Sequence, residues 1–186
     1  MQKRVFLIHG WGGRPDNHWF PWLSWELKAR GFAVEALAMP HADKPKVAEW
    51  ISALKNAVGR PNKETYFVGH SLGCVATLRY FETFPKGAEV GGCVFVAGFS
   101  GNINIPEIAE FYSLPLDISK AKSHCPKFVT IFSDNDGDIP VAESMDFTAK
   151  LGAKAVMEKG KGHFNKDNDV TALPSVFSSL LSFSRD

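Results

Sequence analysis

Short runs of apolar and β-branched residues recur along the chain, and apolar residues at helical spacing occupy the segments between them. Runs of this kind are typical of strands buried on both faces of a sheet, and the helical segments supply the crossovers that parallel strands need. The pattern predicts six strands, over residues 5–9, 33–38, 65–69, 93–97, 127–132 and 153–157.

The segments between the strands carry signals of helix ends. Pro45 and Pro174 each stand where a proline opens a helix, and Gly31 and Gly152 suit the left-handed residue that closes one. We expect helices over about 21–30 and 141–151, and helices that begin near Pro45, near Leu72 and at Pro174. Strands alternating with helices predict a three-layer α/β/α sandwich with a mostly parallel sheet of about six strands.

Length, composition and charge narrow the organisation and the partners. The chain has 186 residues, 45% of them hydrophobic, so we expect a single domain over residues 1–186. The segment 98–126, with a short helix suggested by Ile108 and Phe111, is too brief for a large lid. Lys and Arg number 21 against 20 Asp and Glu, which argues against a nucleic-acid partner.

The sequence carries no sign of export or of a membrane partner. The basic residues near the N-terminus precede only four apolar positions, and no apolar run is long enough to cross a bilayer. Cys74, Cys93 and Cys125 are odd in number and lack Cys-x-x-Cys spacing. We therefore expect three reduced thiols in a cytoplasmic protein with no structural zinc.

The string Gly69-His70-Ser71-Leu72-Gly73 places a Gly-x-Ser-x-Gly pattern where a predicted strand ends and a helix begins. A serine on such a sharp turn has a strained backbone, and small residues two before and two after it let neighbouring chain pass closely. The motif predicts Ser71 as a nucleophile. An ordinary turn flanked by glycines is the alternative.

A serine nucleophile needs a general base, and on this architecture the partners follow in the order serine, acid, histidine. Asp134, Asp136 and Asp138 follow the fifth predicted strand, and His163 follows the sixth. Because the carboxyl ends of parallel strands meet at one edge of a sheet, we expect Ser71, one aspartate and His163 to converge there. Spacing leaves the choice among the three aspartates open. The remaining histidines adjoin other motif elements or lack an obvious serine partner: His9, His18, His41, His70 and His124.

An acyl-transfer site also needs two hydrogen-bond donors for the oxyanion, one of them the amide after the nucleophile. That amide belongs to Leu72, and the glycine-rich segment 9–13 after the first strand offers the amide of Trp11 as the second. A glycine-rich connection without a ligand is the alternative. Phosphate binding is a weaker interpretation, because neither a Gly-Lys-Ser/Thr string nor a complete Gly-x-Gly-x-x-Gly follows the strand.

At these residues the sequence resembles the α/β-hydrolase superfamily, and within it the small serine hydrolases of the YdeN and retinoblastoma-binding-protein-nine family, the YdeN branch above all. The resemblance extends over nearly the whole chain and rests on residues 8–10, 17–23, 39–40, 45–50, 70–74, 162–164 and 173–174. In this family the triad aspartate lies four positions before a proline, which implies Asp136 before Pro140. Gly137 and Asp138 depart from the bulkier or apolar residues usual there, so Asp138 stays a rival.

The resemblance and the motif together imply a serine hydrolase of the carboxylesterase type that acts on a small-molecule ester. Its catalytic residues are expected to be Ser71, Asp136 and His163, its oxyanion donors the amides of Trp11 and Leu72, and no metal or organic cofactor is expected. The aromatic residues considered as walls of a small pocket are Trp11, Trp19, Phe20, Phe99 and Phe111.

Two other functions compete with this one. A peptidase or amidase would use the same triad. A protein-binding module would present an aromatic surface, with Trp19, Phe20, Trp22 and Trp25 as its candidates. We do not expect this protein to bind retinoblastoma protein as its mammalian relatives do. Their Leu-x-Cys-x-Glu string corresponds here to residues 72–76, which end in alanine.

Overall fold

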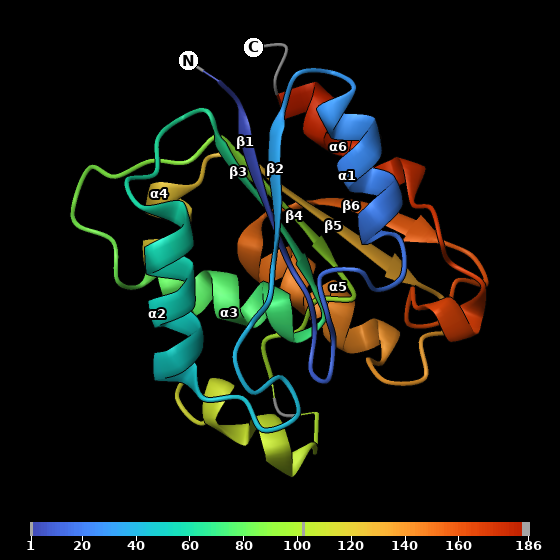
Figure 1. Cartoon of the computed structure of the whole chain (residues 1–186). Coiled ribbons are helices and arrows are strands. Elements are labelled where there is room, and N and C mark those ends of the chain that lie inside the picture. The colour runs from blue at the N-terminus through green and yellow to red at the C-terminus, as the bar shows by residue number, and fades with distance from the viewer. Residues whose placement is uncertain (1, 102, 184–186) are drawn as a thin grey trace.

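Within residues 2–101 and 103–183, which the computed structural model describes, a 6-stranded sheet has the order β2-β1-β3-β4-β5-β6 (Figure 1). The strands are β1 Arg4–Ile8, β2 Ala33–Leu37, β3 Thr65–His70, β4 Gly92–Val96, β5 Phe128–Ser133 and β6 Lys154–Glu158. All neighbouring strands pair in parallel. The predicted six-stranded parallel sheet is confirmed, and no strand end is displaced by more than one residue.

Helices cover both faces of this sheet (Figure 1). On one face lie α1 Phe20–Lys28 and α6 Pro174–Phe183, and on the other lie α2 Val47–Val58, α3 Leu72–Phe81, α4 Ile118–His124 and α5 Val141–Leu151. The 3₁₀ segments are η1 Pro106–Phe111 and η2 Lys166–Asn168. The predicted three-layer α/β/α sandwich is therefore confirmed.

The helix predictions differ in accuracy. Those at 141–151 and from Pro174 are confirmed, and Gly152 caps α5 in the left-handed region at φ +65°. The prediction that Pro45 opens a helix is wrong, because α2 begins at Val47 after an extended Lys46. The segment 98–126 holds α4 in addition to the single short helix expected there.

The centre of the sheet lies between two apolar layers. Successive residues of β3 point to opposite faces, so that Phe67 packs beneath α2 and α3 while Val68 packs beneath α1 and α6. Every residue of β3 is buried, and so is every residue of α3. The turn between β3 and α3 is therefore anchored at both ends in the buried core.

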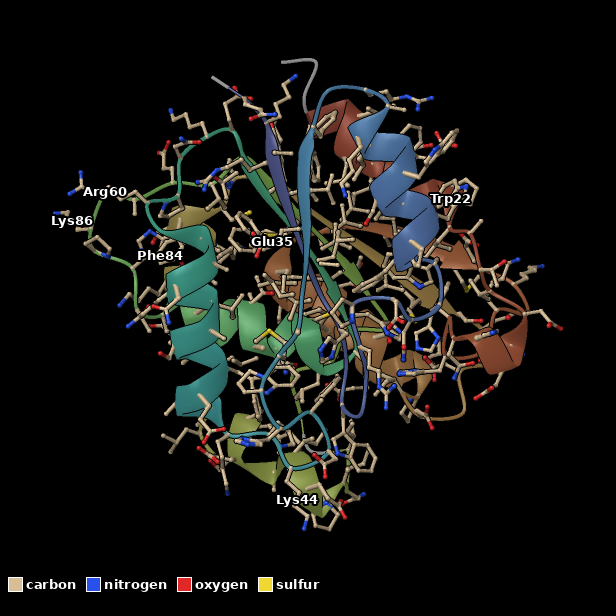
Figure 2. All side chains as sticks on the ribbon, viewed as in Figure 1. Trp22, Glu35, Lys44, Arg60, Phe84 and Lys86 are labelled. Atoms are coloured by element: carbon tan, nitrogen blue, oxygen red, sulfur yellow. The ribbon has the colours of Figure 1, made fainter. Side chains whose placement is uncertain are left out.

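The side of α1 that faces the sheet is buried, and the opposite side is exposed to solvent. Trp19 and Phe20 lie in the core at 0% and 1% exposure, so the predicted aromatic surface that included them is wrong. Trp22, seen beside α1 in Figure 2, contacts Phe177 of α6 with ring centroids 6.2 Å apart. Trp25 is the well-exposed member of the set.

One substitution on the buried face of α1 and one on its exposed face test this difference in burial. Leu23 is fully buried, so Leu23→Ala is expected to lower the free energy of unfolding by about 2–5 kcal/mol through lost burial and a residual cavity. Trp25→Ala, on the exposed face, is the matched control and is expected to change it by about 0.5 kcal/mol or less. Urea denaturation measures both, and equal effects of the two changes would contradict the assignment.

The three cysteines, Cys74, Cys93 and Cys125, are free and buried. Burial raises the pKa of the Cys74 thiol, so this sulfur is a poor nucleophile despite its place three residues after Ser71. Among the described residues, no helix has both the length and the apolar character that crossing a membrane requires.

Candidate active site

Ser71 lies on the turn that joins β3 to α3. Its backbone has φ +53° and ψ −119°, a conformation that non-glycine residues seldom adopt. Two hydrogen bonds hold it there: its amide donates to Val96 of β4 over 2.8 Å, and its carbonyl accepts from the Cys74 amide over 3.0 Å. The strained turn directs the serine to the carboxyl edge of the sheet.

The glycines of the motif are required by close approach. A Cβ atom on Gly69 would lie 2.7 Å from the Cys74 nitrogen, and one on Gly73 would clash with the Ile8 carbonyl of β1. The turn is thus pressed between its own helix and the neighbouring strand. This explains the spacing of small residues around the serine.

The loops after β5 and β6 bring an aspartate to a histidine. His163 Nδ1 lies 2.9 Å from Asp136 Oδ2 and 3.0 Å from Asp136 Oδ1. The Asp136 side chain is 2% exposed, and its Oδ1 also accepts from the amides of Asp138 and Ile139. The Asp138 carboxylate lies 3.8 Å from Nδ1 and is 61% exposed. Of the three aspartates that spacing left open, Asp136 is the one within hydrogen-bond distance of the ring.

The main chain before His163 is attached to the loop that carries Asp136. Three successive amides before His163 donate to three successive side chains at the end of β5 and in the loop after it. The pairs are Gly160 with Asp134 (2.8 Å), Lys161 with Ser133 (3.0 Å) and Gly162 with Asn135 (2.8 Å). Asp136 and His163 are therefore parts of one hydrogen-bonded unit. The sequence indicated an acidic loop at 133–138 but not this role for its first residues.

Contacts from distant segments complete the support of His163. Its amide donates to Asn168 Oδ1 over 2.9 Å, and Trp19 Nε1 donates to the Phe164 carbonyl over 3.1 Å. Phe164 itself has φ +54°, which turns the chain sharply after the histidine. Sequence reasoning missed Asn168 and the role of Trp19, because only the folded chain brings them to this loop.

Two further histidines lie against the same loop. His70 Nε2 is 2.9 Å from the His163 carbonyl oxygen, and the His18 and His70 rings meet edge to face at 5.6 Å. Burial, reinforced by the nearby His163, holds the pKa of His70 well below its usual value. Partial burial, together with His163, also lowers the pKa of His18.

His9 directly follows β1, the strand that pairs with β3. Its Nδ1 donates to the Gly10 carbonyl over 2.8 Å, and its Nε2 accepts from the Met39 amide over 3.2 Å. Burial lowers the pKa of His9, which agrees with a neutral ring that donates at one nitrogen and accepts at the other.

A cavity of about 210 Å³ is bordered by both Ser71 and His163. Its apolar wall consists largely of isoleucines, namely Ile103, Ile105, Ile108 and Ile139. Three of them belong to the segment around η1, which lies beyond the carboxyl ends of the strands (Figure 1). Polar groups on other sides come from Asn17, His18, Asp138 and Asn165.

The predicted aromatic walls of this cavity are partly wrong. Trp11 and Phe20 line it, but Trp19, Phe99 and Phe111 are fully buried in the core and are absent from its lining. Aromatic residues of a small domain are needed first to fill its interior. The sequence did not indicate that isoleucines would form the wall.

The two amides considered as oxyanion donors flank the serine turn. Leu72 is the first residue of α3, so its N–H has no acceptor within the helix. Trp11 follows Gly10, where an added Cβ would lie 3.0 Å from Ser71 Cβ. The loop is fixed by bonds from the Gly12 amide to Ala42 (2.7 Å) and from the Trp11 indole to Asp43 (2.9 Å).

Within the described residues, one group has the composition of a metal site: Asp136, Asp138 and His163, with ligand atoms all within 4.8 Å of one another. Nδ1 of this histidine is bonded to Asp136. Proton sharing between the carboxylate and the ring accounts for this contact without an ion.

Comparisons with known proteins agree with this arrangement. A serine hydrolase family model matches residues 5–182. The chain is similar to the hydrolase YdeN of Bacillus subtilis, with 33% identity over 98% of this chain and 97% of that protein. It is also similar to serine hydrolase RBBP9 of Rattus norvegicus, with 25% identity over 97% and 96% of the two chains.

A solved structure shows the same similarity in three dimensions. The crystal structure of the B. subtilis ydeN gene product superposes with a TM-score of 0.94 at 32% identity and covers 100% of both chains. A family model that spans nearly the whole chain and a relative of this similarity identify the protein's family. The chain belongs to the serine hydrolase family and has the α/β-hydrolase fold.

Proposed function

We propose that the protein hydrolyses small carboxylic esters through Ser71, His163 and Asp136. The observation that supports this most strongly is the Asp136 carboxylate bonded to Nδ1 of His163, a residue that borders the same cavity as Ser71. The single-domain organisation over residues 1–186 without a large lid, and the cytoplasmic location, belong to the same proposal.

In the proposed acylation step, Ser71 Oγ attacks the acyl carbon while its proton passes to His163 Nε2. Asp136 accepts the Nδ1–H bond, which fixes the tautomer and stabilises the imidazolium that forms. The amides of Trp11 and Leu72 hold the oxyanion of the tetrahedral intermediate. Collapse of the intermediate breaks the bond to the alkoxide, which takes the proton from His163 and leaves as the alcohol.

In the proposed deacylation step, water takes the place of the alcohol. His163 accepts a proton from the water as its oxygen attacks the acyl-enzyme, and it returns that proton to Ser71 Oγ as the carboxylic acid is released. All groups needed for both steps belong to the chain. The proposal therefore involves no metal ion or organic cofactor.

The size and lining of the cavity favour short acyl chains. A volume of about 210 Å³ bordered by four isoleucines suits a small apolar acyl group better than a long one. Among p-nitrophenyl esters, kcat/KM is expected to be highest for acetate to butyrate and to fall roughly tenfold or more at octanoate. Steady-state kinetics over this series, with the matching p-nitroanilides alongside, measures it.

The same series distinguishes the competing interpretations. Faster turnover of the anilides than of the esters would identify an amidase or peptidase instead. Purified, folded protein is expected to react with a fluorophosphonate probe, located at Ser71 by peptide mass spectrometry. No reaction with the probe and no turnover of any ester would contradict the proposed function and favour a binding module.

A further inference from the structure

We propose that His70 is a positioning residue that connects the base to the nucleophile; this rests on the proposed function. His70 is the last residue of β3 and directly precedes Ser71. Its Nε2 lies 2.9 Å from the main-chain oxygen of His163, and the two rings are 5.0 Å apart between centroids. One side chain thus joins the strand that carries the serine to the residue that carries the imidazole.

The direction of this hydrogen bond follows from its partner. A carbonyl oxygen only accepts, so His70 Nε2 must carry the proton, and in a neutral ring Nδ1 is then unprotonated. His70 is 4% exposed, and burial lowers its pKa well below the usual value. The charged form of His70 is therefore disfavoured, most of all when His163 beside it becomes an imidazolium.

Three other histidines act on the charge of His70. His163 and His18 lie against its ring, and each of them, like His9 after β1, opposes a positive charge on His70. The other ring contact is Trp19, with centroids 6.0 Å apart. The surroundings of the ring thus favour its neutral form, and its Nε2–H is directed at the His163 carbonyl.

The need for this bond follows from the other contacts of the histidine loop. Those described above attach residues 160–164 to the β5 loop, to Asn168 and to Trp19. None of them reaches β3 or Ser71. Among the hydrogen bonds of the described residues, the one from His70 is the direct link between the loop and the strand of the nucleophile. It therefore sets how the imidazole lies relative to Ser71 Oγ.

Removal of the donor tests the proposal. His70→Leu is expected to lower kcat for a short-chain ester roughly 10- to 100-fold, because a misplaced base is far less effective than a positioned one. His70 also borders the cavity, but the four isoleucines of its wall are unchanged, so KM is expected to change less than kcat. The rate of fluorophosphonate labelling at Ser71 should fall by a factor similar to that of kcat, since it needs the same base.

Two polar variants test whether a restored donor restores the rate. They also keep the proposal testable if His70→Leu fails to fold. In His70→Gln the side-chain amide places an N–H donor at about the reach of Nε2, whereas in His70→Asn it falls one methylene short. Most of the lost kcat is expected to return in His70→Gln but not in His70→Asn. Equal rates in these two variants would overturn the proposal.

His124 offers a matched control. It is also 4% exposed, and its Nδ1 donates to the Ala88 carbonyl over 2.7 Å, but it does not line the cavity. His124→Leu removes an equivalent buried bond, so it is expected to lower the thermal midpoint while kcat stays unchanged. A drop in kcat equal to that of His70→Leu would show that loss of stability alone explains both.

A measurement without substrate separates this proposal from the proposed function. The Nδ1 proton shared by His163 and Asp136 is followed by proton NMR in wild type, His70→Leu and His124→Leu. We expect a shifted or broadened signal in His70→Leu only. If wild type fails to hydrolyse esters but this signal still changes, the proposed function is wrong and the positioning role stands; an unchanged signal and unchanged labelling rate overturn the role itself.

Discussion

Replacing Ser71 with alanine is expected to lower kcat for a short-chain ester by about 10⁵- to 10⁶-fold and to abolish labelling by a fluorophosphonate. The alanine lacks the oxygen that forms the acyl-enzyme, and no other nucleophile is positioned on this turn. The nearby Cys74 thiol is buried, and burial raises its pKa, so it cannot substitute. Ester kinetics and probe labelling measure both effects.

The fold is expected to survive this change. The bonds from Ser71 to Val96 and Cys74 use main-chain atoms, which alanine retains. Ser179→Ala on α6 is a suitable control, because it removes a hydroxyl that donates to the Ser175 carbonyl over 2.7 Å, and Ser179 does not line the cavity. Labelling that persists in Ser71→Ala, with circular dichroism unchanged, would refute the assignment of the nucleophile.

The second large effect is expected from Asp136→Asn, with a loss in kcat of about 10³- to 10⁴-fold. Asp136 Oδ1 accepts from the amides of Asp138 and Ile139, and an asparagine oxygen would keep both bonds. Its NH₂ group would then face His163 Nδ1 and force that nitrogen to accept. The proton of the neutral ring would move to Nε2, where the base must receive the serine proton.

Asp138→Asn is the matched comparison, two residues away in the same loop. The Asp138 carboxylate is mostly exposed and lies beyond hydrogen-bond distance of Nδ1, so kcat is expected to fall by about threefold or less. Steady-state kinetics of the two variants, with urea denaturation to verify folding, decides between them. The reverse order of effects would transfer the acid role to Asp138.

The sheet and the position of Ser71 were predictable because they depend on short-range pattern. Buried parallel strands have continuous apolar runs, and Gly-x-Ser-x-Gly at a strand end is typical of a serine on a sharp strand-to-helix turn. The choice among Asp134, Asp136 and Asp138 was not predictable from spacing, since all three lie on one loop. It depends on which carboxylate turns inward, and that is set by amides donated within the loop and from Gly160.

The surroundings of the site were less predictable because they depend on contacts between distant segments. The bond from Trp19 to the Phe164 carbonyl joins residues 145 positions apart. Phe164 adopts φ +54° although nothing in its type favours a left-handed backbone. The isoleucines of the cavity gave no periodic signal either, because three come from the segment around η1 and Ile139 comes from the loop between β5 and α5.

The two halves of the candidate site rest on elements that differ greatly in burial. Ser71 lies between β3 and α3, in which every residue is buried, whereas His163 follows β6, an edge strand with no buried residue. Local opening has its lowest free energy in exposed edge elements and its highest in the core. On heating, we therefore expect the histidine half to detach before the serine half, so that the proposed activity is lost by a local opening while the central sheet is still folded and amide hydrogens of β3 and α3 are still protected from exchange.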